Sequence, residues 1–266
     1  MKKHFILYGL IISSCLLFSC DNEDEILYDD IPVVEAYLYT NKSLDSIRVV
    51  KTLPFFSDID SNININDLNV IISVNNESYT FKQSTENPDY YIIDNNQLII
   101  QENNEYSFHF DFNDIEVSAS TIAPSKAENF AISKTEIYID DNSFDDEGLE
   151  FTWDNSDEEY YMLSVQLTDT TSLVDNQIFD NAENPPHSIL MPPMNSNTME
   201  INSRMIQYFG NYRAVLFKVN DEYIEMFEGL NQSSSNLIDY PTNIKNGKGI
   251  FTALSSDTLL FNVIEN

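Results

Sequence analysis

Strict alternation of apolar and polar side chains is the feature of this sequence that most limits its fold. In residues 106–112, "YSFHFDF", tyrosine or phenylalanine occupies every second position, and serine, histidine and aspartate fill the positions between. A period of two places the aromatic rings on one face of a strand. Asn113 and Asp114 follow, and residues 115–119 alternate again, which predicts a β-hairpin with one buried face.

Similar short strands separated by turn residues recur along the chain. Residues 31–39 alternate, and residues 70–81 predict a second hairpin that turns near Asn75 and Asn76. The sequence contains only six glycines, so asparagine and aspartate supply most turns. A helical period is evident only in residues 221–230, where acids occupy the first turn. We therefore expect an all-β fold of two antiparallel β-sandwich modules with one short helix.

The chain divides most naturally near "APSKAENF", where a proline and small polar residues separate two sets of strands. We assign residues 31–123 to an N-terminal sandwich and residues 124–266 to a C-terminal module. In the latter, "LEFTWD" followed by a tyrosine-rich strand resembles a fibronectin type III arrangement, and the alternation predicts that Phe151 and Trp153 point into the core.

The first 30 residues carry a different signal. Lys2 and Lys3 precede an apolar run at residues 5–18, which is too short to span a membrane comfortably and is typical of a signal peptide. Ser19 then precedes Cys20, a junction that looks like a bacterial lipobox. We predict a signal peptide at residues 1–19, cleavage after Ser19, and acylation of Cys20, which would hold the protein on a membrane.

An acidic run follows the predicted lipidation site and begins a tether at residues 20–30. It consists of Asp21, Glu23, Asp24 and Glu25. The run is either a solvated spacer or, as in Bacteroidota lipoproteins, an export signal that carries the protein to the outer face of the outer membrane. We expect a lipid-anchored protein that faces the cell exterior.

The net charge limits the possible partners. The formal charge is −31, and removal of Lys2 and Lys3 with the signal peptide makes it −31 − 2 = −33. Such a charge repels nucleic acid and anionic headgroups. We therefore expect membrane attachment through the lipid on Cys20, and no nucleic-acid partner.

The sequence contains no recognisable catalytic or metal-binding motif. His109 and His187 are the histidines outside the signal peptide, too few for a typical zinc or nucleophile–base site. In the acidic loop at residues 140–150 the spacing differs from that of an EF-hand, which leaves a solvated loop or an irregular calcium site. With 44 acids, no carboxylate pair stands out as catalytic. We predict no catalytic residue, cofactor or metal.

Three stretches together resemble a known family: "VVEAYL", "YSFHFDFNDIEVSASTIAP" and "YPTNIKNGKGIFTALS". They are similar to Bacteroidota outer-membrane lipoproteins of the family called domain of unknown function 4249. The resemblance implies location and fold rather than a reaction, and an accessory role in outer-membrane, TonB-dependent transport. We expect a non-catalytic surface lipoprotein. The alternatives are a glycan-binding module and, third, a carboxylate-dependent hydrolase.

Residues 170–198 form the longest stretch without a period, and four prolines lie within it. The apolar residues of this stretch either cover an open sandwich edge or, together with the "NGKGIF" segment, contact an outer-membrane partner. We interpret "NGKG" itself as a hairpin turn. The candidate contact residues are Ile189, Met191, Met194, Lys248 and Phe251.

Overall fold

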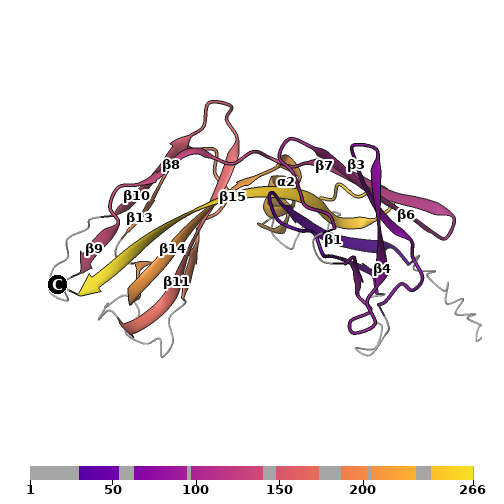
Figure 1. Cartoon of the computed structure of the whole chain (residues 1–266), viewed down its shortest axis with the longest axis horizontal. Helices are drawn as coiled ribbons and strands as arrows, with labels where there is room; N and C mark the ends of the chain where they lie inside the picture. Colours follow the sequence, from indigo (N-terminus) through magenta and orange to yellow (C-terminus); the bar gives the residue numbers. More distant parts are fainter. Residues whose placement is uncertain are drawn as a thin grey trace, which may run out of the picture. The chain divides into compact units, whose positions relative to one another are not determined.

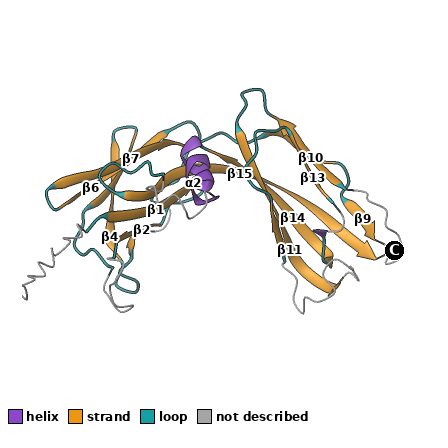
Figure 2. Cartoon of the chain, turned by 180° about the vertical axis from the view of Figure 1, so that it is seen from behind, coloured by secondary structure: helices purple, strands orange, loops and turns teal. Residues whose placement is uncertain are grey.

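The computed structural model describes residues 30–53, 63–94, 97–139, 148–173, 187–202, 205–231 and 241–265. Fifteen strands and one helix lie in these ranges, and the all-β prediction is confirmed (Figures 1 and 2). The first seven strands are β1 (Pro32–Tyr39), β2 (Ser46–Lys51), β3 (Val70–Val74), β4 (Glu77–Gln83), β5 (Tyr90–Ile92), β6 (Glu105–Phe112) and β7 (Ile115–Ile122). The remaining elements are β8 (Glu128–Ile132), β9 (Glu136–Ile139), β10 (Leu149–Asp154), β11 (Tyr160–Leu173), β12 (Ser188–Leu190), β13 (Thr198–Ile201), β14 (Tyr208–Val219), α2 (Asp221–Asn231) and β15 (Lys248–Glu265).

The two predicted hairpins form as expected. Strands β3 and β4 pair in register around a two-residue turn, in which Asn75 and Asn76 have φ angles of 49° and 66°. Asn113 and Asp114 connect β6 to β7 with φ angles of 51° and 62°. Two consecutive positive φ angles define the type I′ turn that suits the twist of a hairpin, and asparagine and aspartate tolerate this conformation better than other non-glycine residues.

A 12-stranded sheet contains most of the strands, in the order β12-β11-β14-β15-β1-β2-β5-β4-β3-β6-β7, with β9 also paired to β15. A smaller sheet has the order β13-β10-β8. The ladders are antiparallel apart from β1–β15 and β9–β15, which are parallel. The sequence did not indicate these parallel pairs, because they join segments that are far apart in the chain.

Buried side chains form two main cores. The first is lined by β1–β7 and contains the aromatic rings of Tyr91, Phe108 and Phe110. The second lies between the smaller sheet and β11, β14 and β15, and Phe151 and Trp153 are buried in it, as predicted. The division at residues 123 and 124 stays a prediction, but the first core also includes Ile244, Phe251 and Ala253, which lie beyond that boundary.

Strand β15 is longer than expected, because the sequence suggested two separate strands and a turn at "NGKG". The turn ends at Gly247, and Gly249 lies inside β15, opposite Val34 of β1. From Lys248 to Leu254 the strand pairs with β1, and from Leu254 onward it pairs with β14. The hairpin interpretation was wrong, since Lys245 before the turn bridges to Ser118 of β7 rather than to β15.

The predicted helix is confirmed as α2, and Figure 2 shows it among the strands. Asn220 caps its start, since its backbone oxygen accepts hydrogen bonds from the amides of Tyr223 and Ile224 at 3.0 and 3.3 Å. Ile224 packs in a third cluster with Met162, Val219 and Leu254, and this contact fixes α2 on the sheet.

Candidate functional site

The predicted lipidation site lies outside the described residues. This is true of Ser19, Cys20 and the acids Asp21, Glu23, Asp24 and Glu25, and of residues 140–147 and 174–186. Their assigned roles stay predictions.

The described part of the long loop forms a backbone edge to the second sandwich. Strand β12 pairs with β11, and the backbone of Met194 exchanges two hydrogen bonds of 2.9 Å with Tyr161. The amide of Met191 donates to the carbonyl oxygen of Leu163 at 2.8 Å. The side chains of Ile189, Met191 and Met194 are half-buried and pack against the second core. These residues therefore cover the open edge of the second sandwich, which was one of the two expectations for residues 170–198.

Phe251 was expected to contact a partner, and this interpretation was wrong. Its side chain is fully buried, and its ring lies 4.9 Å from that of Phe108 in the first core. The structure therefore does not bring Phe251 together with Ile189, Met191 and Met194, which belong to the second core. Lys248 is half-buried at the start of β15, opposite Val33.

Residues 241–247, called here the edge segment, lie within the "YPTNIKNGKGIF" stretch. Two of their side chains form hydrogen bonds with the backbone of β15. The side-chain amide of Asn243 donates to the carbonyl oxygen of Phe251 at 2.7 Å and accepts from the amide of Phe251 at 3.0 Å. The hydroxyl of Thr242 donates to the carbonyl oxygen of Gly249 at 2.8 Å. Two side chains thus satisfy the edge of β15 that faces away from β1, as a neighbouring strand would.

The two glycines of this stretch permit close approach of β15 to its neighbours. Gly249 has a φ of +98°, and a Cβ atom there would lie 2.0 Å from the carbonyl oxygen of Val34. A Cβ on Gly247 would meet Ile244, Pro32 and Val117 at 2.8 to 3.2 Å. This stretch, one of the three that resemble the family, therefore has a structural role: it positions β15 beside β1.

Glu222 is an acid that the sequence did not single out and that bonds three side chains in the described part of the chain. Its Oε1 atom accepts hydrogen bonds from the hydroxyls of Thr121 and Thr252, the latter at 3.1 Å, and from the side-chain amide of Asn220 at 3.3 Å. The carboxylate thus links β7, β15 and the start of α2. An acid in the first turn of α2 was the available signal, but its partners are 101 and 30 residues away.

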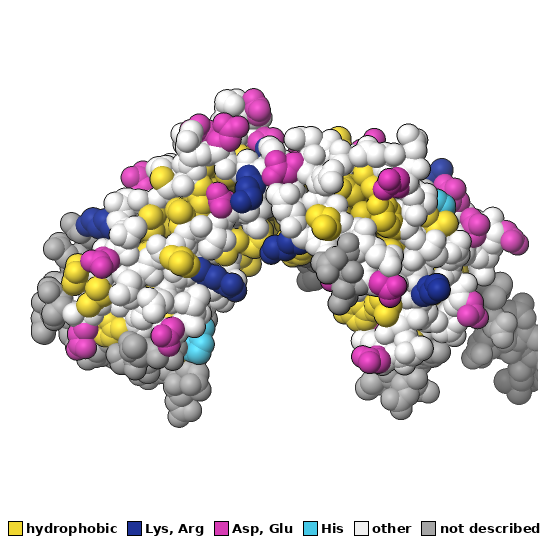
Figure 3. All heavy atoms as spheres, in the orientation of Figure 1, with side chains coloured by type: hydrophobic (Ala, Val, Ile, Leu, Met, Phe, Trp, Pro, Cys, Tyr) yellow, Lys and Arg dark blue, Asp and Glu magenta, His cyan; other side chains and the backbone are white. Residues whose placement is uncertain are grey.

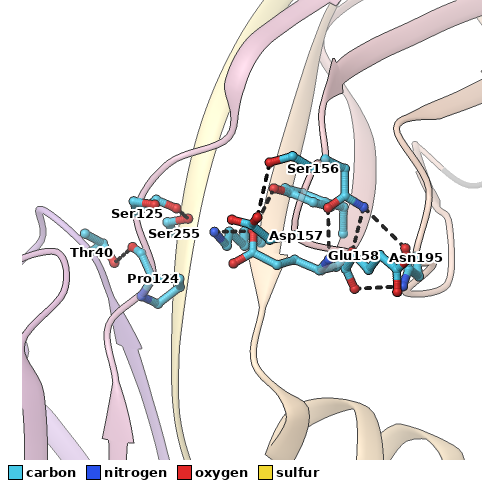
Figure 4. A network of polar contacts seen from close by, with 12 residues as sticks. Thr40, Pro124, Ser125, Ser156, Asp157, Glu158, Asn195 and Ser255 are labelled. Atoms are coloured by element: carbon cyan, nitrogen blue, oxygen red, sulfur yellow. Dashed lines mark hydrogen bonds and ion pairs between the residues drawn. The ribbon is translucent and has the colours of Figure 1, made fainter.

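A second polar cluster holds the turn between β10 and β11 (Figure 4). The side chain of Asn155 bonds both backbone groups of Glu159 at 2.9 Å, and that of Asn195 donates to the carbonyl oxygen of Glu158 at 2.7 Å. The Glu159 carboxylate forms an ion pair with Lys218 and accepts from the hydroxyl of Tyr161 at 3.3 Å. Burial, with Glu159 beside it, raises the pKa of Tyr161 above its usual value. The cluster fixes the turn between β10 and β11.

No carboxylate appears among the buried polar side chains of the described residues, which are Thr40, Thr121, Ser164, Gln207, Thr252 and Ser255. In these ranges no cluster of three or more His, Cys, Asp or Glu side chains could hold a metal ion. His109 is half-buried on β6, and His187 lies against Tyr208 with ring centroids 4.7 Å apart. In the ring pairs that Phe108, Phe151, Trp153, Tyr208 and Tyr212 form, at least one ring is buried.

Leu190 and Leu260 are the two most exposed of the large apolar side chains in the described residues of the second module, and both lie on one sheet face. Leu190 of β12 lies opposite Ser164, and Leu260 of β15 lies opposite Arg213. They are 62% and 69% exposed, and they point away from the second core, because their strand neighbours Ile189 and Phe261 pack into it. In Figure 3, acidic side chains are scattered over the visible surface, with fewer basic ones between them.

No helix of the described residues is both long and apolar enough to cross a membrane. Two solved structures give weak structural matches. The FN1–FN3 domains of chicken CNTN1 share 8% identity over 72% of this chain and 59% of that chain, with a TM-score of 0.26. A structure from a 1.5-MDa bacterial ice-binding adhesin shares 9% identity over 88% of this chain and 64% of that chain, with a TM-score of 0.25. The chain thus spans less than two thirds of the length of either structure, and its own sheets define its fold.

Sequence comparison gives a clearer assignment. No curated protein matches the chain. A family model matches residues 18–259, a range that includes the Ser19–Cys20 junction, the first core, most of the second core and most of β15. The chain therefore belongs to the family described as domain of unknown function (DUF4249).

Proposed function

We propose that this protein is a non-catalytic lipoprotein, held by acyl groups on Cys20 at the outer face of the outer membrane, where it serves as an accessory of a TonB-dependent transport system. The observation that carries the proposal is the Ser19–Cys20 junction behind a lysine head and an apolar run. Two or three acyl chains, at about 0.8 kcal/mol per buried methylene, hold a protein on a membrane almost permanently.

The body of the protein is consistent with binding rather than catalysis. Its cores are apolar, and the polar clusters around Glu222 and Glu159 use their hydrogen bonds to join strands, a turn and a helix. We therefore favour a binding role.

The anchor is tested by replacing Cys20 with alanine in the full chain. We expect the variant to leave the membrane fraction, because the thiol that carries the first acyl chain is gone. Cys15→Ala, in the predicted signal peptide, is the matched control and should stay membrane-bound. Detergent-resistant anchoring of the Cys20→Ala variant would overturn the proposed attachment.

The orientation is tested separately through the acidic run. Changing Asp21, Glu23, Asp24 and Glu25 to alanine should preserve lipidation but protect the protein from protease added to intact cells. Equal cleavage of both forms would show that the run is only a spacer.

The accessory role is tested by photo-crosslinking on intact cells. Because Phe251 is buried, we propose instead that the sheet face with Leu190 and Leu260 contacts the outer-membrane transport protein. A crosslinker at either position should capture an outer-membrane transport protein, whereas one at Ile115, a 54% exposed residue of β7, should not. Equal capture from all three positions, or from none, would rule out this contact.

A further inference from the structure

One strand contributes to both cores. Residues of β15 enter both cores: Phe251 and Ala253 belong to the first core, and Phe261 and Val263 belong to the second. All four are at most 4% exposed. The strand also supplies a backbone ladder to each module, to β1 on one side of Leu254 and to β14 on the other. Disruption of either half of β15 therefore weakens a strand on which both cores depend.

The segment that connects the modules is bonded to the strands beside it. The hydroxyl of Thr40 lies 3.1 Å from the carbonyl oxygen of Pro124 and 3.2 Å from that of Leu254. The hydroxyl of Ser255 donates to the carbonyl oxygen of Ser125 at 2.7 Å (Figure 4). Thr40 and Ser255 are 7% and 1% exposed, so water does not compete freely for these bonds. This segment thus differs from an exposed flexible linker between independent domains.

Helix α2 provides a third connection. Its cluster includes Met162 of β11 and Leu254 of β15, and Tyr37 of β1 packs against it. Burial raises the pKa of Tyr37 above its usual value, which agrees with a ring covered on this face. Through Glu222 the same helix bonds Thr121 of β7 and Thr252 of β15. The cluster thus joins strands that line different cores.

We propose that β15, the connecting segment and α2 couple the two sandwiches into one cooperative unit, so that loss of structure in either core is transmitted to the other. The default for two such modules in one chain is independent unfolding and relative motion. Coupling has a functional consequence: a partner that stabilises one module also stabilises the other.

The test follows each core with its own probe during urea and thermal unfolding of the full chain. Trp153 is the only tryptophan, so its fluorescence reports the second core. Hydrogen exchange of β3, β4 and β6, read by mass spectrometry, reports the first. We expect a single transition with coincident midpoints for both probes.

The decisive variant is Phe81→Ala, which removes a fully buried ring from the first core on β4, a strand outside the coupling elements. Coupling predicts that the Trp153 transition falls together with the first-core transition, by roughly 6 to 20 °C for a buried ring in a chain of this size. Phe261→Ala, in the second core, should shift first-core exchange in the same way. Phe81→Leu and Phe261→Leu are milder variants for use where alanine prevents folding.

Leu260→Ala is the matched control, because it is next to Phe261 on β15 and is 69% exposed. It should leave both probes unchanged. Two separate transitions, or a Phe81 variant that shifts first-core exchange and leaves the Trp153 midpoint at its wild-type value, would overturn the coupling.

Discussion

Gly249 illustrates how one missing side chain permits the parallel contact between β1 and β15. Its φ of +98° lies in a region that L-residues rarely adopt, and its Cα approaches the backbone of Val34 too closely for a Cβ. The atoms that a Cβ would meet belong to the backbone of Val34, which cannot rotate away as a side chain can. Tolerance for substitution is therefore minimal at this position.

Gly249→Ala should lower the free energy of unfolding by about 2 kcal/mol or more, because the strain at a positive φ adds to the clash with Val34. Urea denaturation measures the change. Gly148→Ala is the control: a Cβ there meets the carboxylate end of Glu200, a flexible side chain that can move. A Gly249→Ala protein as stable as the Gly148→Ala protein would contradict the assigned role.

Tyr212 carries a pH dependence. Burial in the second core raises its pKa to about 12, and its hydroxyl donates to the carbonyl oxygen of Tyr208 at 2.8 Å. Because the folded pKa lies above the ordinary value of 10.0, the stabilisation is fully present below pH 10 and is lost as the pH rises toward 12. The urea midpoint should therefore fall over this range, and it should fall less steeply in Tyr212→Phe. Equal slopes for the two proteins would show that Tyr212 does not contribute.

At the scale of elements, short segments cover two strand edges of the sandwiches. Residues 187–194 cover β11, and the edge segment covers the first half of β15. An uncovered edge leaves backbone donors and acceptors available to other chains. The side-chain amide of Asn243 suits this role because it offers an N–H donor and an oxygen acceptor in one plane, as a peptide group does.

Asn243→Ala should lower the free energy of unfolding by about 1 to 3 kcal/mol, because the amide and carbonyl of Phe251 lose their partners. Asn243→Asp keeps an acceptor for the Phe251 amide but lacks the donor, so its stability should lie between alanine and wild type near pH 7. Thermal unfolding of the three proteins gives this order. An alanine variant as stable as wild type would mean that water replaces the amide without cost.

The sequence predicted local elements well and distant contacts poorly. The turns at Asn75–Asn76 and Asn113–Asp114, the inward position of Trp153 and the extent of α2 depend on neighbouring residues, so their patterns could be recognised. Phe251 was misassigned because an apolar residue after two glycines looks exposed until its strand is placed beside β1. The bonds of Glu222 and Asn243 depend on the same distant pairing, which periodicity does not reveal.

At the scale of the whole molecule, the dominant property is the charge of −31. Acids spread over a surface repel one another, and this repulsion opposes the compact state. Raising NaCl from about 10 mM to about 150 mM shortens the Debye length from roughly 30 Å to roughly 8 Å. The melting temperature of the wild-type protein should therefore rise as the NaCl concentration rises, and that of the Gly249→Ala variant should rise in the same way. A melting temperature that falls with salt would mean that favourable ion pairs such as Arg48–Glu35 outweigh the repulsion.

The position of β15 in the chain also bears on biogenesis. A ribosome makes residues 31–240 before the edge segment and β15, so neither core can close until almost all of the described chain has been synthesised. Passage through a secretion channel requires an unfolded polypeptide, and a chain that still lacks β15 cannot have completed either core. For the exported lipoprotein proposed above, the order of synthesis itself delays folding until synthesis is nearly complete.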